Sequence, residues 1–157
     1  MKLTLNIQNR QNKVIFSPKK VKAIILTALK NANIKVPAEI NLLFTTNKEI
    51  QKFNAEYLGK NCPTDVITFD LSKNKKQIIS DIIISADTAI SNAKNYQTTA
   101  VSELYLYAAH GILHILGNND NTVSKRKLMQ KKAEQILSTL DCWPRICSAG
   151  LNLRYRC

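Results

Sequence analysis

The stretch Val101–Leu116 reads VSELYLYAAHGILHIL, and it decides how the rest of the chain is arranged. Its apolar residues fall on nearly every side of a helix, and a helix of that kind is buried. Gly117 follows directly and is a natural helix stop. A buried helix needs other elements packed around it, so we expect the flanking sequence to supply a sheet and further helices.

Upstream of this helix, four segments have the alternation or the β-branched content of strands. They are Leu3–Ile7, Glu39–Thr45, Thr64–Leu71 and Gln77–Ser85. The first segment alternates apolar and polar residues, which indicates a strand with one buried face. The third and fourth are joined by the lysine-rich turn SKNKK.

Helical spacing of apolar residues predicts four more helices. The first begins at Ser17-Pro18, with Ser17 as N-cap and Pro18 at the first helical position. A short helix follows with Asn47 as its cap, and a helix of small residues covers Ala86–Asn95. The last is a basic, amphipathic helix over Thr122–Leu140. The predicted apolar side of the first helix is Val21, Ile24, Ile25, Ala28 and Leu29, and that of the last is Val123, Leu128, Met129, Ile136 and Leu137.

The resulting order β-α-β-α-β-β-α-α-α predicts one α+β domain over residues 1–140, with a mixed sheet of about four strands packed by helices. The segment Asp141–Cys157 differs in composition, with three Cys and three Arg, and we interpret it as a C-terminal tail.

The chain has 157 residues, and its 23 Lys and Arg outnumber its 11 Asp and Glu, so the formal net charge is +12. This excess favours an anionic partner such as nucleic acid, ribonucleoprotein or a membrane surface. With 45% hydrophobic and 22% charged residues, collagen-like and wholly disordered chains are excluded. Residues 1–38 contain eight Lys or Arg and no acid. A run of charges is usually a solvated face, but with this net charge we expect this basic segment and a basic stretch on the last helix to contact a phosphate backbone. That stretch is Lys125, Arg126, Lys127, Lys131 and Lys132.

Two observations concern the compartment. The N-terminal residues lack the apolar core of a signal peptide. The longest apolar stretch, Leu104–Leu116, is shorter than the roughly 20 residues of a membrane-spanning helix. We therefore predict a cytoplasmic protein without a membrane partner.

The only two histidines are His110 and His114, which lie four residues apart on the buried helix. That spacing places both imidazoles on one face, as for two ligands of a metal. Gly117 would end the helix and turn the chain back, so that Asp120 could supply an oxygen ligand. Three protein ligands with an open fourth position describe a catalytic zinc site. The pattern predicts Zn²⁺ at His110, His114 and Asp120, on the buried helix and the segment after it.

Two other interpretations compete with this one. Both residues could be core histidines that are hydrogen-bonded to neighbouring strands. The spacing H-x-x-x-H also occurs in metallopeptidases, where a Glu after the first His activates water. Here that residue is Gly111, which argues against a peptidase. A mid-helix glycine costs about 1 kcal/mol relative to alanine, which indicates close approach to the backbone by a ligand or by a tightly packed neighbour.

The segment His110–Asp120 resembles the signature H-G-x-L-H-L-x-G-Y-D-H of the YbeY family of bacterial ribosomal RNA maturation factors, whose three His bind the metal. Asn54–Leu58 and Pro63–Phe69 are similar to the family's Asn-x-x-Tyr-Arg and Pro-Thr-Asp-Val-Leu-Ser-Phe. Ser80-Asp81-Ile82 resembles a Gly-Asp-Ile strand of the family. The resemblance covers roughly residues 39–140 in collinear order.

This resemblance implies a zinc-dependent single-strand endoribonuclease that acts at the 3′ end of the small-subunit RNA and in ribosome quality control. Its expected partners are single-stranded regions of ribosomal RNA and the small subunit or its assembly factors. Catalytic roles are implied for His114, Thr64 and Asp65, the last two as walls of the cleft. From the residues alone, an acid beside a strand is more often a solvated or capping group.

Departures from the family pattern at three positions bear on the predicted metal and phosphate contacts. Asp120 matches the family's third His and Asn119 matches its Asp, so the alternative is a ligand assignment that slips by one residue. Leu58 stands where the family has an Arg that contacts phosphate or helps catalysis. Its loss favours a second function: a basic RNA-binding ribosome-assembly factor with a structural metal and little or no nuclease activity.

Overall fold

A computed structural model describes residues 1–143, and it confirms a single α+β domain with a mixed sheet. The tail predicted from Asp141 onward lies outside the described residues from position 144. Within the described part, the strands are β1 (Leu3–Asn9), β2 (Ala38–Thr45), β3 (Val66–Asp70) and β4 (Ile78–Ser85). The helices are α1 (Pro18–Asn31), α2 (Asn47–Leu58), α3 (Ala86–Tyr96), α4 (Ala100–Ile115) and α5 (Val123–Thr139).

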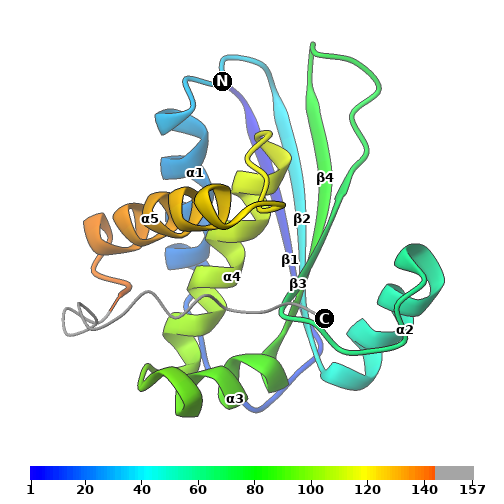
Figure 1. The fold of residues 1–157 in the computed structure, drawn as a ribbon. Helices are drawn as coiled ribbons and strands as arrows, with labels where there is room; N and C mark the ends of the chain where they lie inside the picture. Colours follow the sequence, from blue (N-terminus) through cyan, green and yellow to red (C-terminus); the bar gives the residue numbers. More distant parts are fainter. Residues whose placement is uncertain (144–157) are drawn as a thin grey trace.

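The four strands form one sheet in the order β1-β2-β4-β3 (Figure 1). β1, β2 and β4 are parallel, with Leu5 opposite Ile40 and Ile40 opposite Ser80. β3 runs antiparallel to β4, because the short turn between them reverses the chain. β1 is an edge strand with a half-buried, alternating pattern, as its sequence predicts.

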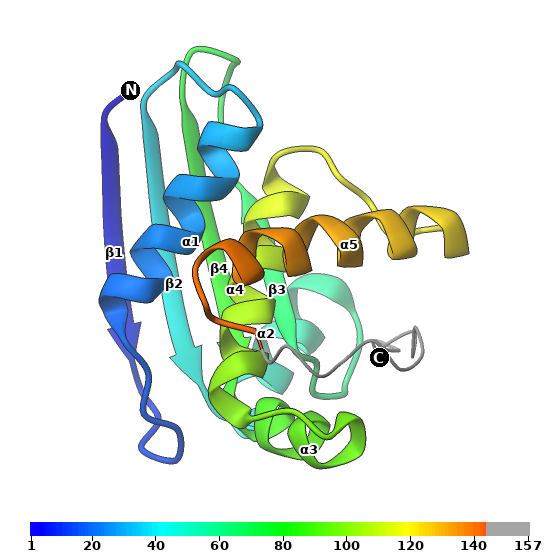
Figure 2. The same ribbon diagram turned by 90° about the vertical axis from the view of Figure 1, so that its left-hand side faces the viewer.

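The helices cover the two faces of the sheet unequally (Figure 2). α1, α3, α4 and α5 lie on one side, and α2 lies on the other. The main core fills the first side, where the sheet contributes chiefly side chains from β2 and β4; these are Ile40, Leu42, Phe44, Ile82 and Ile84. A smaller cluster of Ile50, Ile67 and Ile83 lies beneath α2.

Helix α4 is the central helix of the domain, as its sequence predicts. Every residue from Ser102 to Leu113 is buried, and the helix packs against α1, α3, α5, β3 and β4. Gly111 lies directly over Ile82 of β4, since a Cβ at that glycine would meet the Ile82 Cγ2 at 2.6 Å. Tight packing against the sheet therefore accounts for the mid-helix glycine.

Two local predictions were wrong. Thr46, not Asn47, caps α2: its hydroxyl accepts a hydrogen bond from the Glu49 N–H at 3.4 Å. On α5, Val123 and Leu128 are exposed, because the helix buries a narrower stripe than its apolar residues suggest. That stripe is Met129, Ala133, Ile136 and Leu137. All five residues predicted for the apolar side of α1 are buried.

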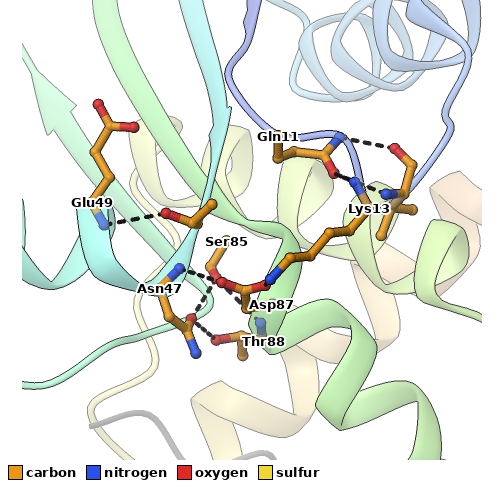
Figure 3. A network of polar contacts seen from close by, with 9 residues as sticks. Gln11, Lys13, Asn47, Glu49, Ser85, Asp87 and Thr88 are labelled. Carbon is orange, nitrogen blue, oxygen red and sulfur yellow. Dashed lines mark hydrogen bonds and ion pairs between the residues drawn. The ribbon is translucent and has the colours of Figure 1, made fainter.

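At the ends of β2 and β4, a polar junction joins the starts of α2 and α3 to the loop after β1 (Figure 3). The Asp87 carboxylate accepts hydrogen bonds from Lys13 Nζ at 2.6 Å and from the Asn47 N–H at 2.8 Å. The Asn47 side-chain oxygen accepts from the Ser85 and Thr88 hydroxyls at 2.6 and 2.8 Å. Asn47, which was predicted to cap α2, therefore links the starts of α2 and α3 through hydrogen bonds.

Two carboxylates at this junction have altered acidities. Burial raises the pKa of Asp87, but the hydrogen bonds from Lys13 and Asn47 and the lysine charge outweigh it and hold the pKa below its usual value. A hydrogen bond from the Thr45 hydroxyl, assisted by Arg10, lowers the pKa of Glu49 against the opposing effect of burial.

Across residues 1–143, none of the helices is both long and apolar enough to cross a membrane.

Candidate metal centre

The segment after α4 turns back on the helix, as the glycine at its end predicts. Gly117 has φ of +86°, a left-handed conformation that glycine adopts without strain. The N–H groups of Gly117 and Asn118 donate to the His114 and Leu113 carbonyls at 2.9 and 3.0 Å. Residues 117–122, which we call the Asp120 loop, thereby fold back beside the last turn of α4.

The fold-back brings His114 and Asp120 together. His114 Nε2 lies 3.7 Å from Asp120 Oδ2, and the two side chains are 17% and 33% exposed. The other ring nitrogen, Nδ1, lies 3.1 Å from the Asn118 carbonyl oxygen. A carbonyl only accepts, so Nδ1 carries a hydrogen in this contact, and Nε2 is the ring nitrogen left to bind a metal. This half-open pair offers the nitrogen and oxygen donors that zinc binds.

His110 lies one turn earlier on α4 and is buried, with 7% of its surface exposed. In residues 1–143, no three His, Cys, Asp or Glu side chains are positioned to hold a metal ion. The complete set of three ligands therefore stays a prediction. Asn119, the alternative ligand, is exposed, whereas Asp120 is the residue beside His114.

Two basic residues of α5 hold the Asp120 loop. Lys132 Nζ donates to Asn118 Oδ1 at 2.6 Å, and Arg126 Nη1 donates to the Asp120 carbonyl at 3.1 Å. The sequence interpretation placed both residues on the RNA-binding surface and missed this role. Helical spacing could have predicted it, because both residues are three positions from buried Met129 and therefore border the stripe of α5 that packs on α4.

Thr64 and Asp65 are both buried at the start of β3. Asp65 Oδ1 accepts from the Val66 N–H at 2.8 Å and from the Thr64 hydroxyl at 3.1 Å. The Asp65 carbonyl accepts from the Ser85 N–H, which connects this corner to the polar junction. A catalytic role for Thr64 and Asp65 stays a prediction.

The Asn54–Leu58 motif shapes the loop that leads to this corner. Asn54 is buried, and its Nδ2 donates to the Cys62 carbonyl at 2.8 Å. Tyr57 packs edge-on against Phe69 of β3, with ring centroids 5.3 Å apart. Leu58, at the position of the family's Arg, is 52% exposed at the end of α2.

Exposed lysines lie along α1 and α5, two helices that contact each other on the same side of the sheet. They are Lys19, Lys20, Lys22 and Lys30 on α1, and Lys125, Lys127 and Lys131 on α5. Of the five basic residues noted on the last helix, these three are exposed, while Arg126 and Lys132 are half-buried against the Asp120 loop.

Comparison with known proteins gives a consistent result. The family model described as Endoribonuclease YbeY matches residues 6–141. The protein named Endoribonuclease YbeY from Syntrophus aciditrophicus (strain SB) is 34% identical over 151 residues, covering 92% of this chain and 94% of that protein. The protein of the same name from Lysinibacillus sphaericus (strain C3-41) is 33% identical over 151 residues, covering 88% and 96%.

A similar fold occurs in a solution structure from Thermotoga maritima. It matches with a TM-score of 0.57 and 23% sequence identity, and the match covers 88% of this chain and 92% of that chain. At this level of identity the likeness concerns the fold alone.

Proposed function

The chain belongs to the YbeY endoribonuclease family, and on that premise we propose that it is a zinc-dependent, single-strand-specific endoribonuclease. Its proposed substrate is ribosomal RNA, at the 3′ end of the small-subunit RNA and in damaged ribosomes. Its proposed partners are the small subunit or its assembly factors. The cytoplasm is the proposed location, because ribosomes are assembled there.

The pairing of His114 with Asp120 carries this proposal. Two ligands of one tetrahedral zinc, with bonds of about 2.0–2.1 Å, lie about 3.3 Å apart. The observed 3.7 Å between Nε2 and Oδ2 reaches that separation with a movement of a few tenths of an ångström. Zinc bound there supplies Lewis-acid polarisation of a phosphoryl oxygen and acidifies water. His110, one turn away on the same helix, is the proposed third ligand.

Hydrogen bonds within the chain orient the proposed zinc ligands even without the metal. The Asn118 carbonyl fixes which nitrogen of His114 carries the hydrogen, and second-shell bonds of this kind orient metal ligands. The partial exposure of His114 and Asp120 leaves room for an RNA phosphate to approach. The exposed lysines of α1 and α5 would hold the flanking backbone through their charge.

The second candidate function is RNA binding during ribosome assembly, with a metal that only holds the fold. It is favoured by Leu58, which is exposed and apolar where the family has a cationic Arg. Such a protein would bind zinc and RNA as strongly as the nuclease, but it would not cleave RNA.

Metal analysis combined with RNA cleavage tests the proposal. We expect the purified protein to bind one zinc per chain and to cleave single-stranded ribosomal RNA, and we expect a chelator to abolish cleavage and added zinc to restore it. His110→Ala and Asp120→Ala should each weaken zinc binding, because two protein ligands remain. Asn119→Ala is the matched control for the neighbouring loop residue and should retain full zinc affinity. Cleavage that survives chelation would contradict a metal-dependent nuclease, and zinc binding without cleavage would favour the assembly factor.

The RNA surface is tested by salt dependence. Each phosphate neutralised on a single strand contributes about 0.7 to the slope of log K against log salt. Replacing Lys125, Lys127 and Lys131 by Gln should therefore flatten the slope by up to about 2. Replacing Lys73, Lys75 and Lys76, which are exposed in the β3–β4 turn, removes the same charge and is the control. If the two triple variants flatten the slope equally, α5 contributes to RNA binding only through the net charge of the protein.

A further inference from the structure

Besides the predicted ligand Asp120, the Asp120 loop takes part in a continuous chain of hydrogen bonds that begins on α5. Lys132 Nζ donates to Asn118 Oδ1 at 2.6 Å, a short distance typical of a charge-assisted bond. From the same side chain, Asn118 Nδ2 donates to the Leu113 carbonyl at 3.0 Å. Both ends of the Asn118 amide are thus fixed, one by α5 and the other by α4.

The backbone of Asn118 is fixed as well. Its N–H donates to the Leu113 carbonyl at 3.0 Å, directly after the left-handed turn at Gly117. Its carbonyl oxygen then faces His114 Nδ1 at 3.1 Å. Side chain and backbone together leave this carbonyl little freedom to turn away from the imidazole.

We propose that Lys132 is a positioning residue that acts through Asn118 on His114. By holding the Asn118 amide, Lys132 keeps the carbonyl in place to accept the Nδ1 hydrogen, and this presents Nε2 to Asp120. The hydrogen on Nδ1 follows from the contact with the Asn118 carbonyl, whereas its consequence for zinc affinity rests on the function proposed above.

One residue of this link departs from the family signature. Asn118 stands where the family signature has Tyr, and its carboxamide offers separate acceptor and donor atoms to Lys132 and to the Leu113 carbonyl. Lys132 is half-buried against the loop, unlike its exposed neighbour Lys131.

The test compares Lys132→Met, which keeps the aliphatic stem but has no donor, with Lys132→Arg, which keeps the charge and the donors. Lys131→Met is the matched control, since it removes the neighbouring lysine from the exposed side of α5. The first measurement is the tautomer of His114 in metal-free protein, from ¹⁵N chemical shifts of the imidazole at about pH 8, above the ordinary pKa of about 6.5. The chain has only two histidines, so a His110→Gln variant assigns the signals.

We expect His114 to carry its hydrogen on Nδ1 in the parent and in Lys131→Met, and to populate both tautomers in Lys132→Met. Zinc affinity, measured by competition with a chelator, should fall about tenfold or more in Lys132→Met, the size found for second-shell changes. Lys132→Arg should restore most of the Nδ1–H population and most of the affinity.

An unchanged tautomer in Lys132→Met would overturn the proposal. If Lys132→Met does not fold, Asn118→Ala breaks the same link from the loop side and should give the same mixture of tautomers. In a double variant that folds, the two effects on zinc affinity should not add, because they remove one chain of bonds. Parent protein that keeps the Nδ1–H tautomer but binds no zinc would refute the proposed function and leave the positioning role supported.

Discussion

Replacing Gly111 by alanine tests how closely α4 is packed on the sheet. The new Cβ would lie 2.6 Å from Ile82 Cγ2, and it needs about 0.8 Å of movement to reach the 3.4 Å of ordinary contact. Alanine gains about 1 kcal/mol of helix propensity over glycine, while overpacking a core costs about 1–3 kcal/mol. We therefore expect Gly111→Ala to lower the free energy of unfolding by about 1 kcal/mol, the difference between these two effects.

Urea unfolding followed by the fluorescence of the single tryptophan, Trp143, measures this change. The sign should reverse in an Ile82→Ala background, where the clashing methyl group is absent and about 1 kcal/mol of propensity remains. Gly117→Ala is the control: its φ is +86° and a Cβ there meets nothing within 4 Å, so its strain is conformational. It should cost about 1–2 kcal/mol in both backgrounds. A Gly111→Ala variant that is more stable than the parent would refute the packing argument.

Three further outcomes are expected. Asp87→Asn should destabilise the protein by about 1.5–3 kcal/mol at pH 7. Because the pKa of Asp87 is lowered in the folded protein, this difference in stability should vanish as the pH falls through that pKa. Urea titrations from pH 7 to pH 2.5 measure it, and a difference that stays constant would contradict the ion pair with Lys13. Ser80→Ala should raise the free energy of unfolding by about 1 kcal/mol in the same titration, since among the described residues the buried Ser80 hydroxyl has no hydrogen-bond partner, and a loss of stability would show that it has one. Leu58→Arg should change stability by less than about 0.5 kcal/mol at this exposed position and should raise the rate of RNA cleavage, so an unchanged rate would remove the family's Arg from the mechanism of this chain.

The sequence predicted each of the nine elements found in residues 1–143, because alternation, β-branched content or helical spacing of apolar residues marks each segment. The strand order was not predicted, although β4 contained a signal for it. Ile82, Ile83 and Ile84 give that strand apolar side chains on both faces, which is typical of an interior strand. The alternation in Leu3–Ile7 correctly indicated one buried face and is compatible with an edge.

The pairing of His114 with Asp120 followed from helical spacing and a glycine turn, both of which are local rules. The contacts of Lys132 and Arg126 with the Asp120 loop depend on how α5 packs against α4. That is a tertiary contact between a basic helix and an apolar one, and local rules do not predict it. Charge alone grouped these two residues with exposed lysines. Their position beside the buried stripe of α5 separates them from that group.

The central position of α4 determines when the protein can fold during its synthesis. The strands β1 and β2 and the helix α1 are complete at Thr45, but α4, which packs against α1 and against the neighbouring strand β4, begins only at Ala100. At about 5–20 residues per second, synthesis of the intervening 55 or so residues takes roughly 3–11 seconds. Throughout that interval the nascent chain exposes an apolar surface that its own later residues will cover. Folding is therefore delayed until the last third of the chain has been made, and the β1-α1-β2 segment is the part most exposed to aggregation during synthesis.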